Sequence, residues 1–225
     1  MTYDLTRLGS ARFEHLVQAL TLGYLGHGVE IFGAGPDGGR EATFRGEVKM
    51  EGKGEWNGYG IVQAKYKERL STTAADQSWF FEQVTAELDA WINPKTKRYL
   101  NKPDYLIIAT NVPLTSVADS GGLDRLKRLF AHYRDLTEKL DNGTASKIGM
   151  PNFKDYDVWH ADYLDRLLEN NEDVRRSYAD LVLPGDVISR LYEQVTATDE
   201  RLVHAWVGHV ARDQARHLGG ARRVR

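Results

Sequence analysis

Apolar side chains recur every three or four positions in several stretches of this chain, and each stretch predicts an amphipathic helix. The predicted helices cover residues 11–22, 76–92 and 122–140, a segment beginning at residue 163, and, towards the end of the chain, about 186–196 and 199–216. In the first helix Glu14 lies at the edge of the apolar stripe. Either Asp76 or Ser78 is the expected N-cap of the second helix.

Shorter segments that alternate between apolar and polar residues, or are apolar throughout, predict strands. They cover residues 29–32, 41–45, 60–66, 104–111 and 156–159. The run at 104–111 is nearly all apolar, which is typical of a central strand buried on both faces. The charged, glycine-rich segment 47–58 is expected to be an exposed loop. The resulting order, α-β-β-β-α-β-α-β-α, predicts an α/β fold with a mixed central sheet flanked by helices and with extra C-terminal helices.

Two polar residues stand out in the strand predicted at 60–66. Strand side chains alternate, so Gln63 and Lys65 point to the same side as Ile61, away from the apolar face of the strand. An amide and an amine are costly to bury without a partner. The nearest acid that arrives on a turn is Asp37, 26 positions before Gln63. We therefore expect Asp37 to be the partner of this polar pair.

The turn that carries Asp37 is rich in glycine. Residues 33–39 contain a G-x-G-x-x-G pattern after a predicted strand, which is typical of dinucleotide-binding loops. Such a loop must open a helix, whereas here Pro36 lies within it and a strand-like segment follows. The glycines are therefore expected to form a tight hairpin. Nucleotide binding by this loop is kept as a minor alternative.

The composition limits which cellular environments and which kinds of site this chain can have. The 225 residues contain no cysteine, which excludes disulfides, cysteine-ligated zinc and a cysteine nucleophile, and fits a reducing compartment. No apolar run approaches the roughly 20 residues of a membrane span. The formal net charge is −2, so binding to nucleic acid requires a local basic patch. The basic cluster at residues 95–102 is either a solvated loop or a phosphate-facing surface.

An acid on a turn and a lysine on the neighbouring strand suit metal-assisted hydrolysis of phosphodiesters. Asp37 would hold a hard divalent cation, Mg²⁺ or alternatively Mn²⁺, through a carboxylate oxygen. The amide oxygen of Gln63 and the backbone carbonyl of Ala64 would add two ligands, and Glu14 a further negative charge. Lys65 would orient the attacking water and stabilise the charge that develops on the phosphoryl oxygens.

Three short segments, in the order in which they occur, resemble the PD-(D/E)xK nuclease superfamily. They are residues 13–17 (Phe-Glu-His-Leu-Val), 36–40 (Pro-Asp-Gly-Gly-Arg) and 63–65 (Gln-Ala-Lys). The closest type is the Mrr-like restriction endonuclease branch, in which glutamine replaces the acid that usually precedes x-Lys. The resemblance implies a restriction-endonuclease-like αβββαβ core over residues 11–111. It also implies that Asp37, Gln63 and Glu14 are metal ligands and that, with Lys65, they form the catalytic site.

Later segments resemble the N-terminal nuclease domains of bacterial antiviral STAND-type NTPases. These segments are residues 103–112, 158–162 and 183–187. In that family a sensor detects a phage product, the NTPase oligomerises, and the clustered nucleases degrade double-stranded DNA. The resemblance implies a cytoplasmic effector nuclease domain over residues 1–198, active as a dimer or tetramer. A helix and linker over 199–225 would then lead to an NTPase and a sensor, since this chain has no G-x-x-x-x-G-K-[ST] phosphate loop.

Two basic residues, Arg40 and Lys67, flank the expected site and are predicted to contact DNA phosphates, which positions a duplex without reading its sequence. No recognition helix or zinc module is evident, so weak sequence specificity is expected. The main alternative is a restriction-fold module that binds DNA or a protein partner without cutting. Asp37 is then a turn residue and Lys65 its structural ion-pair partner. The distance between Glu14 and Asp37 separates the two hypotheses, because metal ligation requires both carboxylates at one cation.

Overall fold

The computed structural model describes residues 3–26, 28–31, 40–139, 145–147, 149–178 and 181. Tyr3–Leu181 form one compact unit, and the other unit, residues 1–2 with 182–225, lies outside the described residues. The boundary predicted at residue 198, the two last predicted helices and the linker therefore remain predictions. Among the described helices, none is long and apolar enough to cross a membrane.

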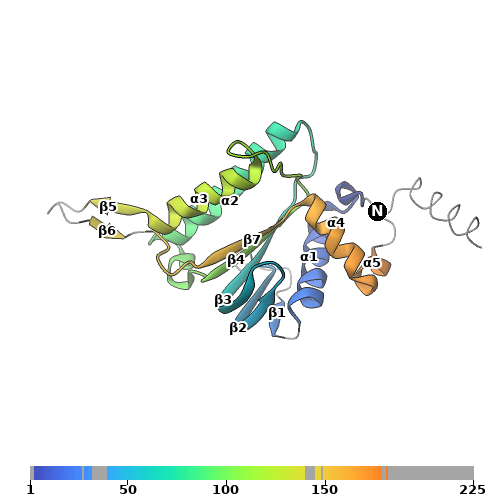
Figure 1. Ribbon diagram of the computed structural model, residues 1–225, viewed down its shortest axis with the longest axis horizontal. Helices are drawn as coiled ribbons and strands as arrows, with labels where there is room; N and C mark the ends of the chain where they lie inside the picture. The colour runs from blue at the N-terminus through green and yellow to red at the C-terminus, as the bar shows by residue number, and fades with distance from the viewer. Residues whose placement is uncertain are drawn as a thin grey trace, which may run out of the picture. The chain divides into compact units, whose positions relative to one another are not determined.

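A five-stranded mixed sheet forms the centre of the compact unit (Figure 1). Its strands, in spatial order, are β1 (Val29–Ile31), β2 (Ala42–Met50), β3 (Gly54–Lys65), β4 (Tyr105–Thr110) and β7 (Asp155–Trp159). β1, β2 and β3 pair antiparallel, whereas β3, β4 and β7 pair parallel. The predicted α/β fold with a mixed sheet is confirmed. All six residues of β4, which lies between β3 and β7, are buried, as expected for an interior strand covered on both faces.

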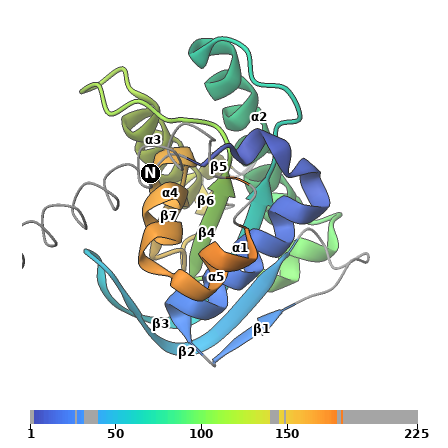
Figure 2. The same ribbon diagram turned by 90° about the vertical axis from the view of Figure 1, so that its right-hand side faces the viewer.

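Helices cover both faces of this sheet (Figures 1 and 2). One face carries α2 (Thr73–Ile92) and α3 (Gly122–Asp135), and the other carries α1 (Gly9–Leu25), α4 (Ala161–Asn170) and α5 (Glu172–Ser177). Two 3₁₀ helices, η1 (Leu5–Arg7) and η2 (Lys97–Asn101), and a small hairpin of β5 (Thr137–Lys139) and β6 (Ala145–Lys147) complete the described elements. The predicted element order is confirmed, and η1, η2, the β5–β6 hairpin and α5 are additions to it. The helix predicted over 122–140 is wrong at its end, because α3 stops at Asp135 and residues 137–139 form β5 instead.

The main apolar core lies between the sheet and the pair α2 and α3. Ile61 of β3 and Ile108 of β4 pack there against apolar side chains of both helices. These include Phe80, Leu88 and Leu126, and all are almost completely buried. Burial of this apolar stripe supplies most of the free energy that holds α2 on the sheet. The core therefore sets which face of β3 lies against α2.

The prediction of an exposed loop at residues 47–58 is wrong. β2 and β3 instead form one long antiparallel hairpin that closes at Gly52, whose φ of 73° suits glycine. The strands form because Val48, Met50 and Trp56 are buried, with exposed fractions of 7%, 1% and 2%. The charged residues between them lie on the solvent side of the hairpin. The many charged residues of this segment made the period-two alternation of buried and exposed positions hard to recognise in the sequence.

The N-cap of α2 is Thr72, not Asp76 or Ser78. The Thr72 hydroxyl accepts a hydrogen bond of 3.3 Å from the backbone amide three residues later, which satisfies one free donor of the first turn. Asp76 lies inside the first turn and is buried, with an exposed fraction of 3%. Several polar residues in this stretch suit a cap, and the position of α2 on the sheet selects among them.

Candidate active site

Gln63 and Lys65 lie at the end of β3 and face α2. Ile61 belongs to the core beneath α2, and side chains two residues apart share a face of a strand, so the predicted common face of Ile61, Gln63 and Lys65 is confirmed. The prediction that this face points away from the apolar side of the strand is wrong, because the main core packs between it and α2. Gln63 is fully buried, and the Lys65 side chain is 15% exposed. A lysine in this position requires a charged partner, because burial disfavours an isolated ammonium.

The partner of both side chains is Glu87 of α2. Its carboxylate accepts a hydrogen bond of 3.0 Å from Gln63 Nε2 and another of 2.5 Å from Lys65 Nζ. Arg98 of η2 forms an ion pair with the same carboxylate. The acidic partner that the sequence called for thus comes from a helix 22 positions after Lys65. Asp37, the expected partner, lies outside the described residues.

Glu41, directly before β2, is a second acid at this site. The backbone of Ala64 donates a hydrogen bond to its carboxyl group, and its Oε2 atom is buried without a hydrogen-bond partner among the described residues. Burial raises the pKa of Glu41 to about 8, against the opposing effect of Lys65, and Glu14 raises it further. A buried carboxylate oxygen without a donor is a favourable place for a cation.

Opposing influences act on the Lys65 ammonium. Burial lowers the pKa of Lys65 and Arg98 lowers it as well, whereas Glu41 and Glu14 raise it. These interactions show that Glu14 of α1 and Glu41 both lie within electrostatic range of Lys65. Glu14, Gln63 and Lys65, three of the four predicted catalytic residues, are therefore brought to one neighbourhood.

The two predicted DNA contacts have partners inside the protein. Arg40 donates a hydrogen bond of 3.3 Å to the Tyr59 hydroxyl. The Lys67 ammonium lies 2.6 Å from the carboxylate of Asp76, which also accepts hydrogen bonds from Ser71. Burial favours a higher pKa for Asp76, but these donors hold it below its usual value. Contact with DNA by Arg40 and Lys67 stays a prediction.

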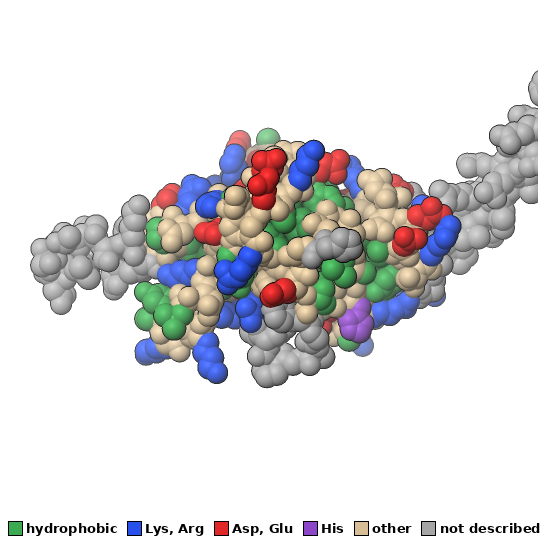
Figure 3. Space-filling view, turned by 90° about the horizontal axis from the view of Figure 1, so that it is seen from below, with side chains coloured by type: hydrophobic (Ala, Val, Ile, Leu, Met, Phe, Trp, Pro, Cys, Tyr) green, Lys and Arg blue, Asp and Glu red, His purple; other side chains and the backbone are tan. Residues whose placement is uncertain are grey.

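The basic cluster at residues 95–102 does not act as one unit. Arg98 is directed to Glu87, and Lys102 Nζ donates a hydrogen bond of 3.1 Å to the backbone carbonyl of Gly149. Lys95 and Lys97 are exposed. On the face shown in Figure 3, Lys and Arg side chains are scattered among acidic ones and form no continuous basic surface over the described residues.

Sequence reasoning missed Glu41 and Glu87, although each leaves a signal. Glu87 falls on the same helical stripe as Val84, Leu88 and Trp91, and an acid on a buried stripe requires a buried donor. Glu41 comes directly before β2, and its backbone amide donates to the carbonyl of Val62, which lies one residue before Gln63. The alternation of β2 and β3 therefore places Glu41 beside the polar pair.

Two carboxylates, Glu14 and Glu41, are the groups here that suit a metal. Within the described ranges no group of three or more His, Cys, Asp and Glu side chains forms a metal site. Asp37 lies six positions after the described residue Ile31 and three before Arg40, outside what the structure describes. The distance between Glu14 and Asp37 would separate the two functional hypotheses, and it involves a residue outside the described ranges.

Glu41→Gln is expected to stabilise the metal-free protein more at about pH 9 than at about pH 6. With a folded-state pKa of about 8, against an ordinary value of 4.5, the folded protein keeps a proton that the unfolded chain releases. Stability therefore falls as the pH rises towards 8, and glutamine removes this loss. The measurement is the difference in Tm between variant and wild type in EDTA. Exposed Glu47→Gln is the control, and a pH-independent difference for Glu41→Gln would contradict the prediction.

Comparison with known proteins gives this chain no family. No protein-family model, curated protein or solved structure matches it. The function proposed below is therefore argued from the sequence motifs and from the geometry around Lys65 alone.

Proposed function

We propose that this protein is a metal-dependent endonuclease that hydrolyses double-stranded DNA with little sequence specificity. The observation that carries the proposal is the arrangement around Lys65: a largely buried lysine on β3 within electrostatic range of two acids, Glu14 and Glu41, from two other segments. Acids that bind a cation, next to a lysine that faces the phosphate, are the groups required for metal-assisted phosphodiester hydrolysis.

The order of the elements supports a restriction-endonuclease-like core. From α1 to β4 the chain runs α1-β1-β2-β3-α2-β4, which is the αβββαβ order of that core. The lysine lies on β3 and the first acid on α1, as the resemblance to the Mrr-like branch implies. In this proposal Glu41 provides the acid at β2, and Asp37 is a further ligand from the preceding turn.

The residues present fit a hard divalent cation such as Mg²⁺. Glu41 Oε2 is a buried oxygen that has no hydrogen-bond donor within the described part of the chain, and Glu14 adds a second carboxylate. Ligation by Gln63 would use its amide oxygen, because its Nε2 donates to Glu87. When bound, the cation lowers the pKa of a coordinated water and polarises the phosphate.

Lys65 is the residue of the chain that would contact the phosphate directly. Its ammonium carries three donors, so the bond to Glu87 leaves others that can reach a phosphoryl oxygen. Glu87 fixes the direction of this ammonium and holds Gln63 in place, while Arg98 balances the charge of Glu87. Stabilisation of developing charge by a donor held in place is a large catalytic effect.

The biological setting of the proposal rests on sequence resemblance. Residues 103–112 and 158–162 resemble effector nucleases of antiviral STAND-type NTPases. In this setting the chain cuts phage or cell DNA after an NTPase and a sensor have clustered it. Cutting both strands of a duplex takes two active sites, so a dimer or tetramer is the active form.

Cleavage of plasmid DNA tests the proposal. We expect nicking or linearisation with Mg²⁺ or Mn²⁺, no product in EDTA, and a loss of at least about a hundredfold in rate for Lys65→Ala. Lys49→Ala, an exposed lysine on β2, is the matched control and should cut like wild type. The assay is run on the chain alone and fused to a tetramerisation segment. Metal-independent product, or full activity of Lys65→Ala, would contradict the proposed site.

One observation favours the alternative of a restriction-fold module that binds without cutting. Lys65 is held at 2.5 Å by Glu87, and a purely structural ion pair would have this geometry. A tetrameric fusion that binds duplex DNA but never cuts it would establish this alternative.

A further inference from the structure

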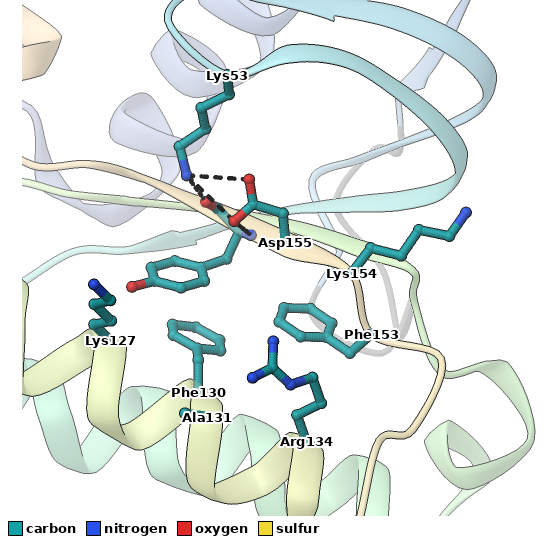
Figure 4. Close-up of a pocket in the computed structure, with 9 residues that line it drawn as sticks. Lys53, Lys127, Phe130, Ala131, Arg134, Phe153, Lys154 and Asp155 are labelled. Carbon is teal, nitrogen blue, oxygen red and sulfur yellow. Dashed lines mark hydrogen bonds and ion pairs between the residues drawn. The ribbon is translucent and has the colours of Figure 1, made fainter.

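A cavity lies at the opposite end of the sheet from Lys65. It has a volume of about 370 Å³ and lies between α3 and the start of β7 (Figure 4). Asp155 at its rim pairs with Tyr105, the first residue of β4, whereas Lys65 pairs with Thr110, the last. Five residues of strand, roughly 17 Å, separate these positions. The cavity is therefore separate from the candidate active site.

One wall of the cavity is an aromatic stack. The ring of Phe130 lies nearly parallel to those of Tyr156 and Phe153, with centroids 3.9 Å and 5.6 Å away and planes within 18° of parallel. Phe130 and Phe153 are only 3% and 5% exposed, so the surrounding core fixes both rings, and Tyr156 is the partly exposed ring of this wall. This wall is a preformed apolar surface for a flat ligand group.

Two cationic side chains of α3 lie on either side of Phe130. Lys127 and Arg134 lie three positions before and four after it, and Figure 4 shows both side chains rising on the same side of the helix. Within the described part of the chain, Lys127 has no hydrogen-bond or ion-pair partner. Among the described residues the polar partner of Arg134 is its exposed neighbour Asp135, at 3.5 Å from Nε, which leaves both terminal nitrogens for a ligand.

The remaining charges of the cavity largely neutralise one another. Lys53 lies 3.5 Å from Asp155 and 4.0 Å from Asp157. Lys154 donates a hydrogen bond of 2.8 Å to the backbone carbonyl of Asn57, away from the cavity. Burial, with the two aspartates, raises the pKa of Tyr156 to about 12, so its hydroxyl stays protonated. The available charge is therefore the pair of cations on α3.

We propose that this cavity binds a nucleoside monophosphate. A guanidinium and an ammonium together suit a phosphate group, which accepts several charge-assisted hydrogen bonds. The aromatic wall suits the base, because flat rings pack favourably against ring stacks. The volume is within the usual range of small-molecule sites, which start near about 300 Å³. None of the proposed nuclease residues Glu14, Glu41, Gln63 and Lys65 lines the cavity, so the proposal does not depend on the proposed nuclease.

Isothermal titration of the full chain tests this site with AMP, GMP, CMP and UMP, and with inorganic phosphate and adenosine as fragments. We expect at least one nucleotide to bind at least about tenfold more tightly than phosphate or adenosine. The double variant Lys127→Ala/Arg134→Ala should weaken that binding at least about tenfold. Lys95→Ala/Lys97→Ala, which removes the same charge from exposed positions, should bind like wild type.

Three outcomes would overturn the proposal. The first is binding of inorganic phosphate as tight as that of every nucleotide, which would mean a simple anion site. The second is a pocket double variant that keeps its circular dichroism spectrum and binds nucleotide like wild type. The third is a chain that binds none of the four nucleotides. If such a chain binds duplex DNA and loses that binding in the double variant, the cavity is part of a DNA surface.

Discussion

Glu41→Gln will abolish metal-dependent DNA cleavage, with a loss in rate of at least about a hundredfold. The substitution keeps the size of the side chain but removes the charge that a cation requires at the buried Oε2 atom. The measurement is the initial rate on supercoiled plasmid with Mg²⁺, using the oligomeric form if only that form cuts. Binding of Mn²⁺ to the same variant, followed by titration, should weaken in parallel, since the metal loses one of its carboxylates.

Two further variants show which acid binds the metal. Glu47→Gln changes an exposed acid on β2, the strand that follows Glu41, and should leave the rate within about twofold of wild type. Asp37→Asn tests the ligand expected from the sequence. A fully active Glu41→Gln together with an inactive Asp37→Asn would show that the metal site is built on the glycine-rich turn and that Glu41 is only a buried neighbour.

Glu87→Ala will lower the free energy of unfolding by about 3 kcal/mol. The Glu87 carboxylate accepts hydrogen bonds from Gln63, Lys65 and Arg98. Its removal therefore takes one acceptor away from a buried amide and from two cations. The side chains of Glu87, Lys65 and Arg98 are only 11%, 15% and 27% exposed, and water therefore compensates incompletely. Urea denaturation followed by circular dichroism gives the change.

A second acid on α2 provides the control for this experiment. Glu82 is exposed, and Glu82→Ala should change the free energy of unfolding by no more than about 0.5 kcal/mol. Glu87→Gln, which keeps the shape and one acceptor oxygen, should fall between the two alanine variants. If Glu87→Ala is as stable as Glu82→Ala, the three bonds to Glu87 contribute little and Lys65 is not held in place by them.

Stability and function are coupled at Glu87. The residue touches no expected substrate atom, yet it sets the position of the lysine that would face the phosphate. Glu87→Gln is therefore expected to reduce cleavage even where the protein remains folded, through loss of orientation rather than of metal. Unchanged binding of Mn²⁺ in this variant would identify it as a positioning residue.

Elements with a strong local pattern were predictable from the sequence. The apolar run of β4 and the stripe of α2 each bury their side chains as the pattern indicates, because the period of apolar residues is set within the element itself. The extension of β2 and β3 into one long hairpin, where the sequence predicted an exposed loop at 47–58, was not predictable for the opposite reason. Its strands carry many charges on the solvent face, and only pairing with each other reveals that Val48 and Trp56 share a buried face.

The sequence by itself determined the order of the elements, the strand that carries Gln63 and Lys65, and the need of that pair for an acid. Strand alternation and the cost of an unpaired buried amine are local properties, and they follow from the residues alone. Only the tertiary structure decided that the acid is Glu87 and that Glu41 lies beside it. Both choices depend on how α2 and the start of β2 pack against the end of β3, and such contacts between distant segments are set by burial of the whole core.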